Sequence, residues 1–228
     1  MSGYTIPYVT ERSGGVERSM DVYSRLLSER IVYLGTELDD GVANVLIAQL
    51  LHLESSSLDS PIQLYVNSPG GSPSAMLAVY DTMQHIRPKV ATTCVGQAGG
   101  PAAVLLAGGA PGMRSILRHG RVVLHQPASE GRGAIPDLIL HADEVLRVRA
   151  ELEAVLAHDT GRTGEQIRHD TDRDLVLPAV AAVEYGLADR VVAVERAGAF
   201  GVPGSSAGSG GSVGPGASGG EQQEIARV

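Results

Sequence analysis

The sequence predicts an α/β fold built on a largely parallel sheet. Short apolar runs rich in β-branched residues alternate with segments of helical period, in the order "RIVYLG", "GVANVLIAQLLHLESS", "IQLYVN", "PSAMLAVYDTMQHI", "KVATTCVG", "PAAVLLAGG" and "RVVLHQP". Such alternation is typical of buried parallel strands covered by helices. A longer helical pattern follows, over about residues 137–158. From about residue 197 onward, a Gly- and Ser-rich composition replaces both patterns.

Length and composition predict one core domain. The chain has 228 residues, of which 43% are hydrophobic, and this suits a single well-buried domain with a short appendage. We place this domain at residues 19–196, after an N-terminal segment at 1–18. The tail at 197–228 has almost nothing to bury, so we expect it to be disordered.

Hydropathy, charge and cysteine content argue against several classes of protein. No apolar run approaches the roughly 18 residues of a membrane span, and the N-terminus lacks the order of a signal peptide. We therefore expect a soluble, cytoplasmic protein with no membrane partner. The net charge of −8 and the scattered arginines argue against nucleic acid as a partner. The single cysteine, Cys94, lies in an apolar run, and no disulfide, metal or cofactor is expected.

The long helical pattern predicts a projecting amphipathic helix. Its apolar stripe consists of Leu138, Ala142, Val145, Leu152 and Leu156. Arg149 falls within the stripe, which indicates that part of this face meets another polar surface. The preceding "ASEGRGAIP" is rich in turn-forming residues, so it predicts a hinge and a helix that needs a partner.

Two glycine-rich turns have the pattern strand, turn, helix. In "YVNSPGGSPS" the glycines allow backbone amides to face a ligand beside a helix N-terminus, although a plain tight turn explains them too. "VGQAGGPAAVLLAGG" repeats the pattern, with Pro101 as the first residue of the helix. His125 stands at a strand end, where a lone histidine is more often structural than catalytic. The charged run "DTDRD" at 170–174 is typical of a solvated helix surface.

In their order and spacing, these stretches resemble the proteolytic subunit of the Clp protease. The resemblance runs from about residue 6 to residue 192 and includes "ERSMDVYSRLLSERIVYLG", "NSPGG", "YDTMQHI", "GQA", "LHQP" and "AVEYGLAD". It implies a right-handed superhelix of ββα units related to the crotonases, assembled as two stacked seven-membered rings around a chamber. The projecting helix would be the handle that joins the rings, and residues 1–18 would form an axial loop.

The resemblance also assigns the parts of a serine-protease site. In active members the turn reads "GQAAS"; its serine attacks the peptide carbonyl, a histidine takes the proton, and an aspartate orients that histidine. His125 falls on the base and Asp174 on the orienting acid, but Gly100 falls on the nucleophile. Of the two backbone amides that bind the oxyanion, Gly71 offers one. The other position is Pro101, which has no N–H.

These two replacements predict an inactive subunit with a structural or regulatory role. The serines nearest in the motifs are Ser72, Ser74 and Ser129. None lies on the turn at residue 100 that would aim a side chain at His125, so none is expected to replace the missing nucleophile. An active ATP-dependent serine endopeptidase is the alternative, because the histidine and the aspartate are present. A crotonase-like enzyme acting on an acyl thioester is a third hypothesis, and Pro101 argues against it as well.

The resemblance implies further contacts with partners, chiefly active paralogues in mixed heptameric rings. Asp172 and Arg173 match a pair that links subunits across the rings, whereas Pro136, near the start of the handle, departs from the family. The residues that fit the apolar docking pocket for the hexameric AAA+ unfoldase are Tyr65, Val95 and Leu117. Four polar residues fall on positions of this pocket that are usually more apolar in the family, namely Gln63, His85, Thr93 and Ser115. Because polar groups disfavour an aliphatic anchor, we expect docking to be weak or altered.

Overall fold

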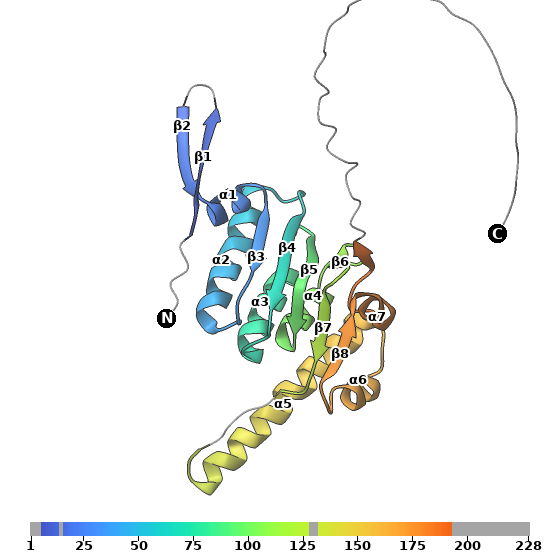
Figure 1. Ribbon diagram of the computed structural model, residues 1–228. Coiled ribbons are helices and arrows are strands. Elements are labelled where there is room, and N and C mark those ends of the chain that lie inside the picture. Colours follow the sequence, from blue (N-terminus) through green and yellow to red (C-terminus); the bar gives the residue numbers. More distant parts are fainter. Residues whose placement is uncertain (1–5, 14–15, 128–131, 193–228) are drawn as a thin grey trace, which may run out of the picture. The chain divides into compact units, whose positions relative to one another are not determined.

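The computed structural model describes residues 6–13, 16–127 and 132–192 (Figure 1), and its main sheet confirms the predicted α/β fold. Five strands run parallel in the order β3-β4-β5-β6-β9, namely β3 (Ile31–Leu34), β4 (Ile62–Ser68), β5 (Val90–Gly99), β6 (Arg114–Leu117) and β9 (Arg190–Val192). Two more strands, β7 (Arg121–Leu124) and β8 (Leu175–Pro178), pair antiparallel with each other, and β7 also pairs parallel with the end of β5.

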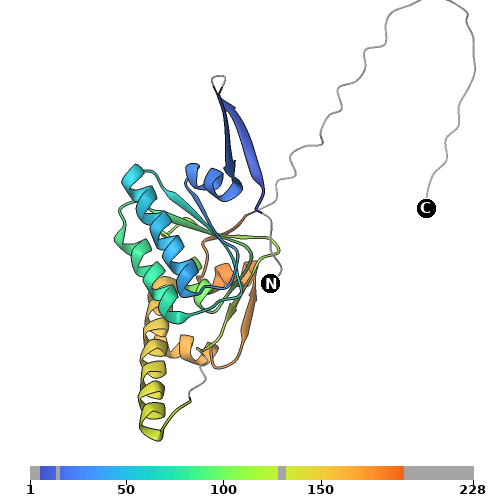
Figure 2. The same cartoon turned by 90° about the vertical axis from the view of Figure 1, so that its left-hand side faces the viewer.

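Helices and strands bury complementary apolar surfaces. Every second residue of β4 is buried, as expected for a strand whose side chains alternate between two faces. The helices α2 (Asp40–Ser56) and α3 (Pro73–His85) pack side by side on one face of the sheet (Figure 2). All seven residues of α4 (Pro101–Ala107) are buried, so this short helix belongs to the core. The chain ends its described part with α6 (Gly164–Asp170), α7 (Ala179–Tyr185) and β9.

The predicted long helix is α5 (Ile135–Thr160), which extends the expected range by two residues at each end. Pro136 stands in its first turn, where a missing N–H leaves no helical hydrogen bond unmade. The C-terminal half packs into the domain and buries Leu152, Glu153 and Leu156. The N-terminal half extends away from the sheet (Figure 1) and exposes Ile135, Leu138, Ile139, Leu140 and Leu146. The predicted stripe is thus covered at one end and bare at the other.

The N-terminal part of the domain is a hairpin of β1 (Tyr8–Ser13) and β2 (Val16–Asp21), followed by α1 (Val22–Ser28). The predicted boundary after residue 18 falls inside β2. The predicted tail at 197–228 and residues 128–131 of the predicted hinge lie outside the described residues. Among the helices that the structure describes, none is long and apolar enough to cross a membrane.

Candidate active site

The two glycine turns meet at one edge of the sheet, because β4 and β5 are parallel neighbours and each runs into its turn at the C-terminal end. Their close approach requires glycine. A Cβ on Gly99 would overlap the carbonyl of Pro69, and a Cβ on Gly70 would lie 3.0 Å from the carbonyl oxygen of Gly99 and 3.4 Å from Cδ of Pro101. The two turns therefore form one continuous surface.

Gly71 is held by an isolated parallel bridge with Leu38. The N–H of Leu38 donates to the Gly70 carbonyl (2.8 Å), and the N–H of Ser72 donates to the Leu38 carbonyl (2.7 Å). This pattern leaves the N–H of Gly71 outside the bridge, and Gly71 lines a pocket. Its φ of +140° favours glycine. That Gly71 donates to an oxyanion remains a prediction; the structure places the residue at the pocket, beside Gly100.

Gly100 forms a sharp elbow between β5 and α4, with φ 43° and ψ −114°. Its N–H donates to the Val123 carbonyl (2.7 Å), which fixes the turn against β7. A Cβ at this position would lie 2.6 Å from Nε2 of His125. A side chain on this elbow would therefore point at the histidine, as the nucleophile of a serine hydrolase does.

His125 and Asp174 are brought opposite each other by the pairing of β7 with β8. Leu124 faces Leu175 in this antiparallel ladder, so His125 and Asp174 are the next pair beyond it. The two side chains are not joined: Nδ1 of His125 lies 3.1 Å from the Gln126 carbonyl oxygen, and Asp174 is exposed. The imidazole lies instead beside the space that a side chain at position 100 would fill.

Pro101 begins α4 at the predicted position and is fully buried. Its ring stands where the second oxyanion donor would need an N–H. The nearby hydroxyls are engaged elsewhere. Ser72 caps α3 by accepting from the N–H of Ala75 (3.3 Å), and its hydroxyl lies 3.0 Å from that of Ser74. Ser129 falls outside the described residues.

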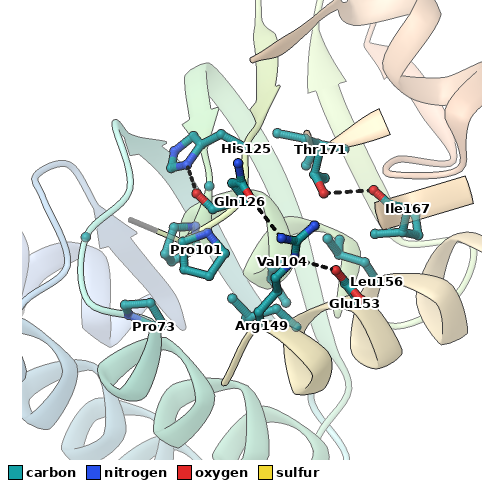
Figure 3. A pocket seen from close by; sticks show the side chains of 15 residues that line it. Pro73, Pro101, Val104, His125, Gln126, Arg149, Glu153, Leu156, Ile167 and Thr171 are labelled. Carbon is teal, nitrogen blue, oxygen red and sulfur yellow. Dashed lines mark hydrogen bonds and ion pairs between the residues drawn. The ribbon is translucent and has the colours of Figure 1, made fainter. Parts of the chain in front are cut away.

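A pocket of about 150 Å³ opens beside Gly100 and His125 (Figure 3). Its walls come from α4, α5, α6 and the loop after β7. The apolar residues that line it include Val104, Leu124, Leu152, Leu156 and Ile167. Pro101 and Pro73 also line it and are labelled in Figure 3. The dimensions and lining are those of a site for one amino-acid side chain or a similar small group.

One wall of the pocket is charged, as the position of Arg149 in the apolar stripe predicts. Arg149 donates from Nε to Glu153 (2.7 Å) and from Nη1 to the side-chain oxygen of Gln126 (2.7 Å). Arg168 binds the other oxygen of Glu153 (2.7 Å). Glu153 and Arg168 were not singled out from the sequence, although the spacing of four residues between Arg149 and Glu153 is the signal that could have found their pair.

The carboxyl of Glu153 is held in its ionised form. Its side chain is 8% exposed. Burial raises the pKa of this carboxyl, but hydrogen bonds from Arg168 and Arg149 outweigh burial, so the pKa lies below its usual value. The cluster of Arg149, Glu153 and Arg168 therefore carries one net positive charge.

The predicted partner contacts occupy other surfaces. Asp172 and Arg173 are exposed and lie 3.8 Å apart, next to Asp174. The three predicted docking residues, Tyr65, Val95 and Leu117, lie half-buried on neighbouring strands β4, β5 and β6. The four polar residues at positions that are usually apolar in the family differ in burial. Gln63 and Thr93 are half-buried on β4 and β5, Ser115 is buried on β6, and His85 is exposed at the end of α3.

The fold and the site together define a class of protein. A strand-to-helix elbow faces a histidine, and a second glycine turn lies beside it in the same pocket; this is the layout of a serine hydrolase, with glycine at the position of the serine. The chain belongs to the Clp protease family, whose family model matches residues 14–195. This finding confirms the resemblance that the motifs indicate.

Curated relatives agree with this assignment. The chain is 60% identical over 193 residues to "ATP-dependent Clp protease proteolytic subunit 4" of Rhodococcus jostii, covering 85% of this chain and 100% of that one. It is 64% identical to "ATP-dependent Clp protease proteolytic subunit 1" of Nocardia farcinica, covering 84% of this chain and 98% of the relative. It is 54% identical to a "Putative ATP-dependent Clp protease proteolytic subunit-like" protein of Streptomyces coelicolor, covering 85% and 92%. The chain is thus a protein of the proteolytic-subunit type.

Proposed function

We propose that this chain is a non-catalytic subunit of a cytoplasmic ATP-dependent Clp protease, with a structural or regulatory role. One observation carries the proposal: the backbone elbow that aims a side chain at His125 holds Gly100, which has none. In a model protease, loss of the nucleophile alone costs on the order of a millionfold in rate. Loss of one oxyanion donor, as at Pro101, typically costs about a hundred- to a thousandfold.

The proposed role is assembly with active paralogues in mixed heptameric rings. The bare apolar half of α5 supports it, because a projecting apolar helix surface calls for a partner. The exposed pair of Asp172 and Arg173 could serve the contact across the rings. Docking of a AAA+ unfoldase on the face of Tyr65, Val95 and Leu117 would be weak or altered.

A fluorophosphonate probe tests the missing chemistry. The purified chain should remain unlabelled, because no serine lies on the elbow. A serine protease of measured activity serves as the labelled control. Stoichiometric labelling of a serine in this chain would overturn the proposal in favour of the alternative, an active ATP-dependent serine endopeptidase; the presence of both His125 and Asp174 favours that alternative.

Assembly is tested separately. The tagged chain should co-purify with an active paralogue from the same cell, and native mass measurement should show particles that contain both subunits. Rings made of this chain alone, in cells that hold an active paralogue, would contradict the mixed-ring proposal.

A further inference from the structure

The pocket beside Gly100 is placed to receive a side chain of a bound peptide. It opens at the elbow and at Gly71, where the carbonyl of a peptide would lie in a serine hydrolase, and it continues between α4, α5 and α6. Its volume of about 150 Å³ equals that of an engineered cavity that holds benzene. One side chain of moderate length therefore fits.

Most polar side chains in this pocket have hydrogen-bond partners, but one nitrogen of Arg149 has none among the described residues. Both oxygens of Glu153 accept hydrogen bonds from arginines, and the side chain of Thr171 donates to the Ile167 carbonyl (2.8 Å). In Arg149, Nε and Nη1 have partners, whereas Nη2 has none among the described residues. Figure 3 shows its guanidinium between Gln126 and Glu153 at the wall of the pocket. The Arg149 side chain is 24% exposed and lines both this pocket and a shallower hollow beside Arg168, so solvent reaches its guanidinium.

We infer that this pocket selects a peptide side chain with an apolar stem and a terminal carboxylate, namely glutamate, and that Arg149 is the specificity-determining residue. The stem would contact Val104, Leu152 and Ile167, and the carboxylate would accept from Nη2 of Arg149. The net positive charge of the arginine cluster adds to this attraction.

An apolar side chain of the same length is disfavoured for a complementary reason. It would displace water from the partly exposed guanidinium of Arg149 and return no acceptor, and removing water from a charged donor without giving it a partner is unfavourable. Sites built around a hydrogen-bonding group reject analogues that lack the matching group more strongly than apolar pockets reject small changes of shape. We expect leucine to bind roughly tenfold to a hundredfold more weakly than glutamate.

The inference rests on the proposed function, since a bound peptide stays uncut only where no nucleophile faces it. The chain would then hold peptides that its active neighbours leave behind or have yet to cut. Binding specificity and catalytic competence can still be measured independently.

The test uses the full-length chain and fluorescent tripeptide amides that differ only in the last side chain, which is glutamate, glutamine, leucine or lysine. Fluorescence polarisation should rank glutamate first and lysine last. Arg149→Met, which keeps an unbranched apolar stem and removes the charge, should remove the preference for glutamate and strengthen the binding of leucine. A gain of affinity for leucine cannot come from misfolding.

Arg147→Met is the matched control. Arg147 lies on the same helix but pairs with Glu144 and Glu151 at the surface, so its substitution should leave the ranking unchanged. Equal affinities for glutamate and leucine, an unchanged ranking in Arg149→Met, or no binding by any peptide would each overturn the inference. Mass spectrometry of the same mixtures detects cleavage, which would refute the proposed function while leaving the ranking interpretable.

Discussion

At the scale of single residues, two adjacent positions decide the chemistry and leave the backbone intact. Gly100 keeps the elbow at φ 43°, and Pro101 starts α4 without loss of a helical hydrogen bond. Around them lie His125, the proposed base, and Gly71, the proposed oxyanion donor. Under the proposed function, the loss is therefore confined to one side chain and one N–H.

Restoring the two groups separately should reveal their separate effects. Gly100→Ser alone should recover little peptidase activity, because one oxyanion donor is still missing and because a Cβ at position 100 lies 2.6 Å from Nε2 of His125, so the imidazole must move. Adding Pro101→Met should raise the rate further, by up to about a hundred- to a thousandfold. Hydrolysis of a fluorogenic peptide gives both rates.

A third variant controls this comparison. His125→Ala in the double variant should abolish the recovered rate, since the base is then absent. Equal rates for the single and double variants would show that the missing N–H does not matter.

At the scale of elements, α5 divides into a packed half and a bare half. The sequence period predicted the helix to within two residues at each end, and it predicted the polar contact of Arg149. It could not predict which half is covered, because α4 and α6 meet α5 only through tertiary packing. The ion partner Arg168 lies fifteen residues from Glu153 and on another helix, beyond the reach of helical spacing.

At the candidate site, too, local sequence patterns located the turns but not their tertiary arrangement. Strand-turn-helix patterns located both glycine turns, and the family resemblance located His125 and Asp174. No local pattern could give the register of β7 with β8, which consist of four residues each and pair across fifty residues of intervening sequence. The separation of the His125 and Asp174 side chains depends on tertiary geometry and was likewise beyond the sequence.

The buried carboxylate on α5 predicts a pH-dependent stability. Because the folded pKa of Glu153 is lowered, its ionised form stabilises the fold above the unfolded pKa of about 4.3, and this contribution is lost as pH falls toward the folded pKa. Glu153→Gln should lower the free energy of unfolding by about 2–4 kcal/mol at neutral pH, and the difference should shrink in acid. Urea denaturation at about pH 7 and about pH 3.5 measures both values.

Glu151→Gln provides the comparison on the same helix. Glu151 pairs with Arg147 at the surface and is 43% exposed, so its loss should change stability by less than about 1 kcal/mol. Similar effects from the two substitutions would contradict the role given to burial at Glu153.

At the scale of the whole domain, Arg114 connects segments that are distant in sequence. Its guanidinium binds Asp189 through Nε (3.1 Å) and Nη2 (2.6 Å). Nη1 donates to the carbonyls of Ala107, Asp159 and Gly186, at or next to the ends of α4, α5 and α7. One side chain on β6 thereby connects the ends of three helices, of which α4 and α5 form walls of the pocket.

Arg114→Lys should destabilise the domain by about 3 kcal/mol although it keeps the charge, because an ammonium cannot reproduce the planar fork of donors. Chemical denaturation monitored by circular dichroism measures the loss. Arg121→Lys is the control, since Arg121 is exposed and, within the described part of the chain, its side chain donates only to Gln97 (3.0 Å). An equally small effect at both positions would show that the carbonyl contacts of Arg114 contribute nothing.

The backbone conformation of Gly100 also affects the stability of the subunit. A serine at φ 43° would hold its backbone in a strained region, at a cost of order 1–3 kcal/mol, whereas glycine adopts it without that strain. Under the proposed function, glycine at this position thus relieves backbone strain as well as removing the nucleophile. If active neighbours supply enough cleavage, each copy of this subunit in a mixed ring would make the ring more stable by the backbone strain that a serine at this position would carry.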